Sequence, residues 1–186
     1  IEEENYFFKL SKYQDSLLQY LGTEGVVVPE WRRQEAVNFV KQGLEDFSIS
    51  RVKEKMSWGI PVPGNDTQII YVWFDALTNY ITALGYADDG EKFKKYWREN
   101  PHRTHVIGKG ILRFHAVYWP AMLLSAGLPL PTEIFVHGYL TVEGQKISKS
   151  LGNVIMISDL LKKYSANVIR WYLISHHHRN GFEFQN

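Results

Sequence analysis

Apolar side chains recur at spacings of three and four over residues 6–21, which is typical of one buried helical face. The glycines at positions 22 and 25 predict the end of that helix. Residues 30–46 carry a second apolar pattern with helical spacing. The start of the chain is therefore predicted to be a two-helix scaffold.

The next strong pattern is an uninterrupted apolar run at residues 69–74, which predicts a buried strand with Asp75 as the N-cap of the following helix. If helical geometry begins near the end of that strand, four side chains converge on one side. These are Trp73, Ala76, Leu77 and Tyr80. Such a side is either the wall of a pocket or ordinary core packing, and core packing is the commoner outcome.

A strand, a glycine turn and a helix follow one another in the middle of the chain. Residues 105–108 predict the strand, Lys109 and Gly110 the turn, and residues 111–126 the helix. This succession is typical of the phosphate-binding corner of doubly wound folds. Ile111, His115 and Trp119 share one face of the predicted helix because they stand four apart. Residues 133–137 predict a further strand. Near the end of the chain, Ser158 is the predicted cap of a helix over residues 159–164, and a second helix is predicted over residues 166–175.

Residues 144–153 combine glycine, serine, lysine and asparagine, which predicts a loop. Lys146 and Lys149 place two ammonium groups on that loop, and Ser148 adds a hydroxyl. Such a set suits the clamping of a polyphosphate while its charge redistributes. A solvated basic turn is the alternative, and composition alone favours it.

Composition narrows the class of protein only broadly. With 186 residues, 45% apolar and 15% aromatic, the chain is expected to be globular with one or two domains. A net charge of +1 is too small to indicate nucleic-acid binding by itself. The chain has no cysteine, so no disulfide framework or thiolate metal site is expected. No apolar run approaches a membrane span, so no membrane partner is expected.

The run Lys-Ile-Ser-Lys-Ser at 146–150, followed by Leu-Gly-Asn, resembles the signature loop of class I aminoacyl-tRNA synthetases. The resemblance implies that Lys146, Ser148 and Lys149 act on ATP during amino-acid activation. It also implies a set of ATP contacts, which come from the glycine turn, from the end of the strand at 133–137 and the residues after it, and from the loop itself. These are Gly108, Lys109, His137, Gly138, Leu140, Lys146 and Lys149.

Two further strings resemble the methionine-binding segments of the methionine-specific members of this family. They are Tyr-Val-Trp-Phe-Asp-Ala-Leu at 71–77, and Gly-Lys-x-Ile-x-x-Phe-His-x-x-x-Trp-Pro-Ala at 108–121. The enzymes for leucine, isoleucine and valine have Ser where Ala76 stands. One departure is Gly110, where the family usually has Asp. The implied methionine pocket consists of Trp73, Ala76, Leu77, Tyr80, Ile111, His115 and Trp119.

The family also needs a His-Ile-Gly-His motif early in its nucleotide fold, and none occurs here. The resemblance therefore implies an α/β fold that is half of a doubly wound parallel sheet with flanking helical segments. It also implies three parts of the chain. Residues 1–48 would end an insertion, residues 49–153 would form the second half of the catalytic domain, and residues 154–186 would begin a helical stem-contact region.

The expected activity is ligation of methionine to its tRNA through methionyl-adenylate. ATP with Mg²⁺ would be the co-substrate, and no zinc ligands are expected in this chain. The expected partners are methionine, ATP, the methionine tRNA and the missing N-terminal half of the catalytic domain, without which the chain would be inactive. The compartment would be the cytoplasm or the mitochondrial matrix. A synthetase for another aliphatic amino acid and a non-catalytic tRNA-binding or interaction fragment are the alternatives.

Overall fold

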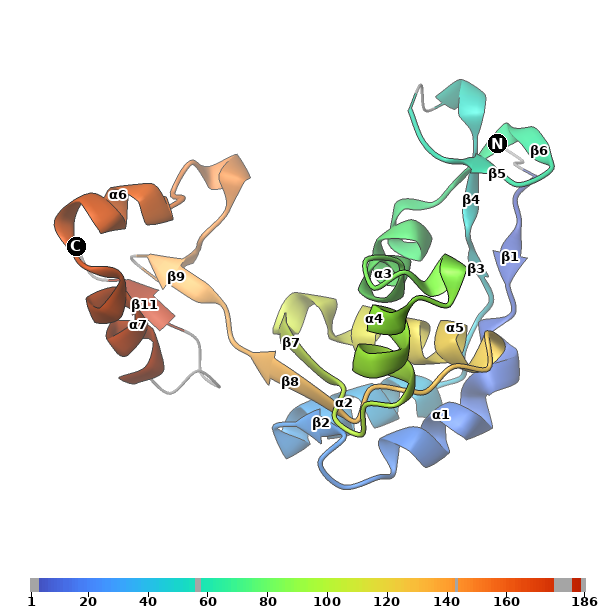
Figure 1. Ribbon diagram of the computed structural model, residues 1–186, viewed down its shortest axis with the longest axis horizontal. Helices are drawn as coiled ribbons and strands as arrows, with labels where there is room; N and C mark the ends of the chain where they lie inside the picture. Colours follow the sequence, from blue (N-terminus) through green and yellow to red (C-terminus); the bar gives the residue numbers. More distant parts are fainter. Residues whose placement is uncertain (1–3, 56–57, 143, 176–181, 185–186) are drawn as a thin grey trace.

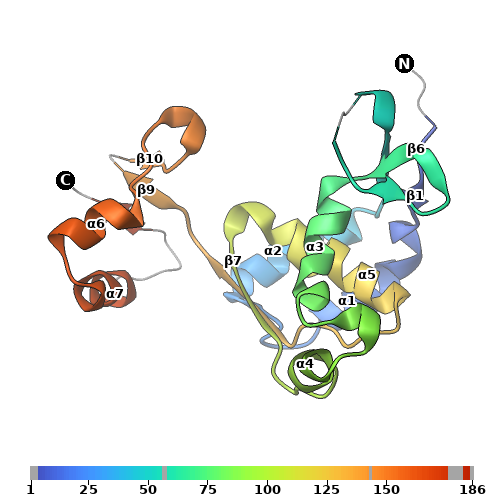
Figure 2. The ribbon, with the colours of Figure 1, turned by 45° about the horizontal axis from the view of Figure 1, so that its top comes forward.

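The computed structural model describes residues 4–55, 58–142, 144–175 and 182–184, and the side chains of all of these except 55, 149 and 182–184. It has a mixed α/β fold. Figures 1 and 2 show a larger lobe, which runs to the end of β8 (Glu133–His137), and a smaller lobe drawn in orange and red. The two lobes join at residues 138 and 139, between β8 and β9 (Leu140–Val142).

The larger lobe is built on a three-stranded parallel sheet in the order β2 (Val27–Val28), β8, β7 (Thr104–Gly108). Its register pairs Thr104 with Glu133 at one end and Gly108 with His137 at the other. The carboxyl ends of β7 and β8 therefore meet at one edge of the sheet. In open parallel sheets that edge is where ligands bind.

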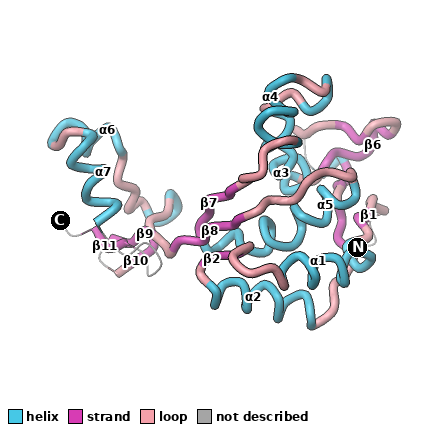
Figure 3. The backbone as a smooth tube through the Cα atoms, turned by 60° about the horizontal axis from the view of Figure 1, so that its bottom comes forward, coloured by secondary structure: helices cyan, strands magenta, loops and turns pink. Residues whose placement is uncertain are grey.

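One long helical segment connects β7 to β8. It begins as a 3-10 turn (Lys109–Ile111), passes through a π-helical turn (Phe114–Tyr118) and ends as α5 (Trp119–Ser125). Its side chains enter two separate core clusters. Leu112, Ala116, Val117 and Ala121 pack with the sheet, α1 (Gln14–Leu21) and α2 (Glu30–Lys41), which lie together in Figure 3.

The other side of this segment packs against α3 (Val72–Thr82) and the helix formed by α4 (Glu91–Phe93) and its π-helical continuation Lys94–Arg98. Trp119, Met122 and Leu123 are its buried contributions. A helix with apolar residues on all sides has to lie inside a fold. The segment is therefore the central element of the larger lobe.

The helix predicted over residues 6–21 is shorter than expected. β1 (Phe7–Phe8) pairs with β3 (Phe47–Ser48), and a 3-10 turn (Leu10–Tyr13) precedes α1. Backbone pairing with residues 47–49 takes the first part of the helical pattern into an extended conformation. The second predicted helix ends at Lys41 instead of residue 46, because Gly43 adopts a φ of 97°.

The predicted end of the strand over residues 69–74 is wrong. β6 (Asn65–Ile70) stops earlier and lies between β4 (Ser50–Val52) and β5 (Pro61–Val62) in an antiparallel sheet. The Tyr71 N–H bonds to the Ile49 carbonyl, and the Tyr71 carbonyl accepts the first bonds of α3. Tyr71, not Asp75, is therefore the N-cap, and Trp73 lies in the first turn of the helix.

The smaller lobe consists of a sheet and two helices. β9 lies between β10 (Gln145–Lys146), which is antiparallel to it, and β11 (Phe182–Phe184), which is parallel. α6 (Ile157–Lys163) is capped by Met156, so the prediction that Ser158 is its cap is wrong. α7 (Ala166–Ser175) follows, as its pattern predicts. Short 3-10 turns complete the described chain at Lys53–Lys55, Tyr86–Asp88 and Lys149–Leu151.

No helix in the described ranges is long and apolar enough to cross a membrane.

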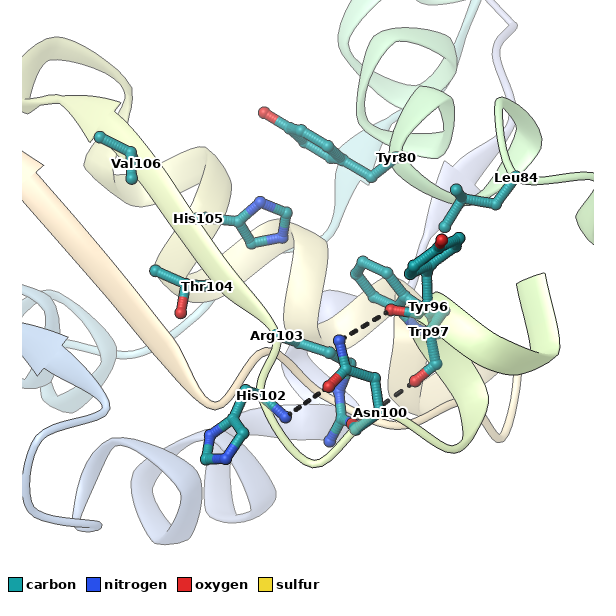
Figure 4. Close-up of a pocket in the computed structure, with 10 residues that line it drawn as sticks. All are labelled: Tyr80, Leu84, Tyr96, Trp97, Asn100, His102, Arg103, Thr104, His105 and Val106. Atoms are coloured by element: carbon teal, nitrogen blue, oxygen red, sulfur yellow. Dashed lines mark hydrogen bonds between the residues drawn. The ribbon is translucent and has the colours of Figure 1, made fainter. Parts of the chain in front are cut away.

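A buried histidine lies where β7 meets the second core cluster. The Trp119 indole N–H donates to Nε2 of His105 at 3.2 Å. Figure 4 shows the imidazole ring of His105 between Tyr80 and strand β7. Burial lowers the pKa of His105 from its ordinary 6.5 to about 4, and the nearby His115 acts in the same direction. His105 is therefore neutral near pH 7, with its proton on Nδ1.

This burial makes the free energy of unfolding depend on pH. Between pH 6.5 and 4 the unfolded state binds more protons at this site than the folded state, so stability is lost as the pH falls. We expect a slope of up to about 1.4 kcal/mol per pH unit from one such group. His105→Gln, which keeps an acceptor for the indole, should reduce the slope measured by urea unfolding. His102→Gln, a change at an exposed histidine, should leave it unchanged.

Candidate functional site

The carboxyl ends of β7 and β8 bring the two predicted nucleotide-binding segments together. Gly108 stands opposite His137 in the register. A Cβ atom at Gly108 would lie 3.5 Å from the His137 ring, which is an ordinary contact distance. The His137 Nδ1 atom lies 2.6 Å from its neighbour's carbonyl oxygen at Gly138. Leu140 follows as the first residue of β9.

Two lysines from distant parts of the sequence lie over one tyrosine ring beside this edge. Lys109 Nζ is 4.4 Å and Lys146 Nζ is 4.3 Å from the centroid of the Tyr139 ring. Lys109 follows β7, whereas Lys146 comes from β10 in the smaller lobe. Tyr139 was not among the predicted site residues. The only signal for it was an aromatic residue between Gly138 and Leu140.

The loop at 144–153 is closed by its own asparagine. Asn153 Oδ1 accepts from the Ser148 backbone N–H at 2.8 Å, and its Nδ2 donates to the Lys146 carbonyl at 3.1 Å. The Ser148 and Ser150 hydroxyls are 2.7 Å apart. Gly152 turns the chain with a φ of 69°. The loop is therefore internally bonded.

The loop prediction needs one correction. Lys146 belongs to the β10 strand, where it pairs with Thr141, and is not part of an irregular loop. The hairpin pairing accounts for this, because it extends the ladder to the first lysine of the motif. Lys149 begins a 3-10 turn, but its side chain lies outside the described part of the structure.

The predicted methionine-binding residues centre on a hydrogen-bonded pair. The Tyr80 hydroxyl lies 2.8 Å from His115 Nε2, and His115 Nδ1 lies 3.0 Å from the Ile111 carbonyl. A carbonyl oxygen only accepts, so Nδ1 carries a proton. Burial lowers the pKa of His115 and raises that of Tyr80. The imidazole is therefore neutral near pH 7, and the Tyr80 hydroxyl donates to Nε2.

Aromatic rings extend from this pair. The ring centroids of Trp119 and Tyr80 are 6.0 Å apart. Both residues belong to the second core cluster together with the buried Leu77. Trp73 stacks on Phe114 with their centroids 3.9 Å apart. The helix pattern did not single out Phe114, because nothing in its spacing separates a stacking partner from a core residue.

Two of the predicted pocket residues differ from the rest in their surroundings. Ala76 is exposed on α3, while Ile111 packs against the first core cluster and reaches His115 through its carbonyl oxygen. The structure thus gathers Trp73, Leu77, Tyr80, His115 and Trp119 and leaves Ala76 at the surface. No group of three or more His, Asp or Glu side chains in the described ranges is arranged to hold a metal ion.

Comparisons with known proteins cover nearly the whole chain. The family model described as "tRNA synthetases class I (M)" matches residues 1–185. The methionine–tRNA ligase of Brucella suis is 54% identical over 175 residues, which are 94% of this chain and 33% of that protein. The methionine–tRNA ligase of Thermotoga maritima is 53% identical over 94% of this chain and 27% of its own length.

Solved structures give the same result for the fold. A crystal structure of Mycobacterium tuberculosis methionyl-tRNA synthetase bound by methionyl-adenylate matches with a TM-score of 0.88 and 44% identity. The match covers 99% of this chain and 36% of that one. The chain thus spans about a third of the length of the relatives it matches. Since the family model matches almost every residue, the chain belongs to the class I tRNA synthetases of the methionine (M) type.

Proposed function

We propose that this chain is the part of a methionine–tRNA ligase that binds methionine and the phosphates of ATP. The observation that carries the proposal is that one helical segment begins at a lysine cluster and continues into an aromatic cluster. The lysine cluster is Lys109 and Lys146 around Tyr139, and the aromatic cluster is Trp73, Tyr80, His115 and Trp119. Lys109 precedes Ile111, whose carbonyl oxygen bonds to His115 in the aromatic cluster. The relatives named above bear the name of this activity.

In the proposed first step a carboxylate oxygen of methionine attacks the α-phosphorus of ATP. The new P–O bond forms as the bond to the bridging oxygen of the β-phosphate breaks, and pyrophosphate leaves with the electron pair. In the second step a tRNA hydroxyl displaces AMP from the methionyl carbonyl. No covalent intermediate with the protein is needed, so catalysis consists of orientation and charge stabilisation.

The lysines would offset the negative charge of the polyphosphate as the leaving group forms. Lys109 and Lys146 both contact the Tyr139 ring, and the resemblance adds Lys149 and the Ser148 hydroxyl. His137, Gly138 and Leu140 would lie beside the adenine, and Gly108 beside the phosphates. Mg²⁺ would come with ATP, since this ion is commonly held mainly by substrate phosphates and water.

The aromatic cluster suits a flexible thioether side chain. Trp73 and Tyr80 are half-buried rings, and Trp119 is a buried ring of the same cluster. Sulfur–ring contacts contribute about 0.3–1.5 kcal/mol each. His115 is held neutral and fixed by two hydrogen bonds, so it adds no charge to an apolar pocket. Leu77 and Ile111 would complete the wall. Ala76, which is exposed here, would be covered by bound substrate.

We also infer that the parallel sheet continues into a doubly wound fold in the complete protein. Val106 on β7 is 68% exposed, whereas the next residue, Ile107, is 4% exposed. Parallel sheets in α/β proteins are normally covered on both faces. The uncovered face of β7 therefore suits a missing N-terminal half of the catalytic domain. Residues 1–48, 49–153 and 154–186 would be the end of an insertion, the second half of the catalytic domain and the start of the stem-contact region.

Amino-acid-dependent exchange of pyrophosphate into ATP tests the function. A protein that joins this chain to the segments by which its relatives are longer should exchange with methionine and not with leucine, isoleucine or valine. The 186-residue chain alone should show no exchange, because it supplies only part of the expected site. Equal kcat/KM for methionine and leucine would contradict the substrate assignment.

The pocket is tested by removing one ring. In the complete enzyme, Trp73→Ala should raise the KM for methionine at least tenfold and change the KM for ATP by less than threefold, since Trp73 belongs to the aromatic cluster alone. Trp58→Ala is the matched control, because that ring is 86% exposed. Circular dichroism has to show that both variants are folded. A folded Trp73→Ala enzyme with unchanged methionine affinity would remove Trp73 from the pocket.

The lysine cluster is tested by the rate of adenylate formation. Lys146→Ala should lower that rate by about 10²–10³, which is typical for the loss of one preorganised charge contact, and leave the KM for methionine nearly unchanged. Lys162→Ala, a change at an exposed lysine paired with Asp159, should have no effect. Rapid-quench measurement of adenylate formation compares the two variants. Normal adenylate formation by Lys146→Ala would favour the solvated basic turn.

A further inference from the structure

Tyr139 has no part in the reaction derived above, yet it occupies the junction of the two lobes. It follows β8 and precedes β9. The ammonium groups of Lys109 and Lys146 lie over its ring at 4.4 and 4.3 Å from the centroid. One lysine belongs to the larger lobe and the other to the smaller. The ring thus joins two cationic side chains that the backbone places in different lobes.

The glycine at position 110 leaves space that the Tyr139 hydroxyl occupies. A Cβ atom there would lie 2.9 Å from the Tyr139 hydroxyl oxygen, closer than real Cβ contacts come. The same atom would lie 3.5 Å from Cε1 and 3.7 Å from Cζ, which are ordinary contacts. Only the hydroxyl therefore conflicts with a side chain at this position. The missing side chain at Gly110 and the hydroxyl of Tyr139 are a matched pair.

Among the residues that the structure describes, no acidic group balances the charges around the ring. In the described part of the chain no carboxylate forms an ion pair with Lys109 or Lys146. Two ammonium groups that share one ring repel each other, and the electron-rich ring face offsets part of that repulsion. A polyphosphate is the kind of ligand that two neighbouring ammonium groups can hold together.

We propose that Tyr139 is a positioning residue that gathers Lys109 and Lys146 into one polyphosphate-binding site, and that the space left by Gly110 admits the Tyr139 hydroxyl. The proposal rests on the proposed function insofar as the polyphosphate is that of ATP. Tyr139 contacts the lysines and not the reacting atoms. Its ring is the essential part, and its hydroxyl is the part that Gly110 accommodates.

Nuclear magnetic resonance of the chain with ¹³C-methylated lysines tests the arrangement without any activity. Methylation keeps the lysine charge. Two methyl signals, assigned by Lys109→Arg and Lys146→Arg, should be shifted upfield by the ring current. Tyr139→Leu should abolish both shifts and Tyr139→Phe should keep them. The signal of Lys162 should not change. Upfield shifts that are absent, or that survive Tyr139→Leu, would overturn the proposal.

Titration calorimetry with inorganic tripolyphosphate tests the role of the ring in binding. Tyr139→Leu should weaken binding about five- to thirtyfold, as expected for two cation–ring contacts, and Tyr139→Phe should stay within twofold. Trp31→Leu is the matched control, because Arg32 lies 3.9 Å over that ring on α2. Equal binding by the chain and by Tyr139→Leu would overturn the positioning role.

Gly110 is tested by coupling. Gly110→Ala should weaken tripolyphosphate binding in a chain with Tyr139, and should have little effect in a chain that also carries Tyr139→Phe. If the two substitutions changed the free energy of tripolyphosphate binding additively, the pairing of Gly110 with the Tyr139 hydroxyl would be refuted. Ring-dependent tripolyphosphate binding in a complete protein that lacks methionine-dependent exchange would overturn the proposed function and support the Tyr139 site. The two proposals therefore fail separately.

Discussion

The larger lobe depends on the burial of one helical segment on both of its sides. Leu112 and Ala116 hold it to the parallel sheet and to α1 and α2, while Trp119 and Leu123 hold it to α3 and α4. Because side chains three and four apart share a face, the same turns that carry these contacts also fix the direction of His115. The candidate site is therefore a consequence of core packing on both sides of the segment.

The parallel pairing of β7 with β8 supplies the second half of the site. It sets Gly108 opposite His137, so that the turns after both strands start from the same edge. Lys109 and Tyr139 come from these two turns and meet directly. In the smaller lobe, the hairpin of β9 and β10 brings Lys146 to the same ring. Two contacts with one ring thus assemble a cationic group from lysines that are 37 positions apart in sequence.

The aromatic cluster is kept free of charge by the same burial that stabilises it. His105 and His115 both have lowered pKa values because their rings lie away from water. Each accepts one hydrogen bond from a neighbouring ring, from Trp119 and Tyr80 respectively. Neutral imidazoles in fixed tautomers suit an apolar ligand. In the lysine cluster, by contrast, Lys146 is exposed and Lys109 is half-buried.

Much of the local structure was determined by the sequence. The strand at 104–108, the helix after it, the strand at 133–137 and α7 follow from apolar periodicity, and these elements were predicted correctly. The residues expected to lie on one side of α3 share a cluster with Trp119 except for Ala76. These predictions succeeded because periodicity reports which face of an element is buried, and burial is a local requirement.

Tertiary structure alone decided the rest. The apolar run predicts a strand at residues 71–74, but the Tyr71 carbonyl accepts the first bonds of a helix, from the N–H groups of Phe74 and Asp75. Phe7 is in a strand, although its spacing predicts a helix, because its backbone pairs with β3. The resemblance placed Lys109 and Lys146 in one set of ATP contacts, but the contact of both with Tyr139 depends on which strands become neighbours. Pairing between distant segments is a property of the folded chain, and no local pattern of residues encodes it.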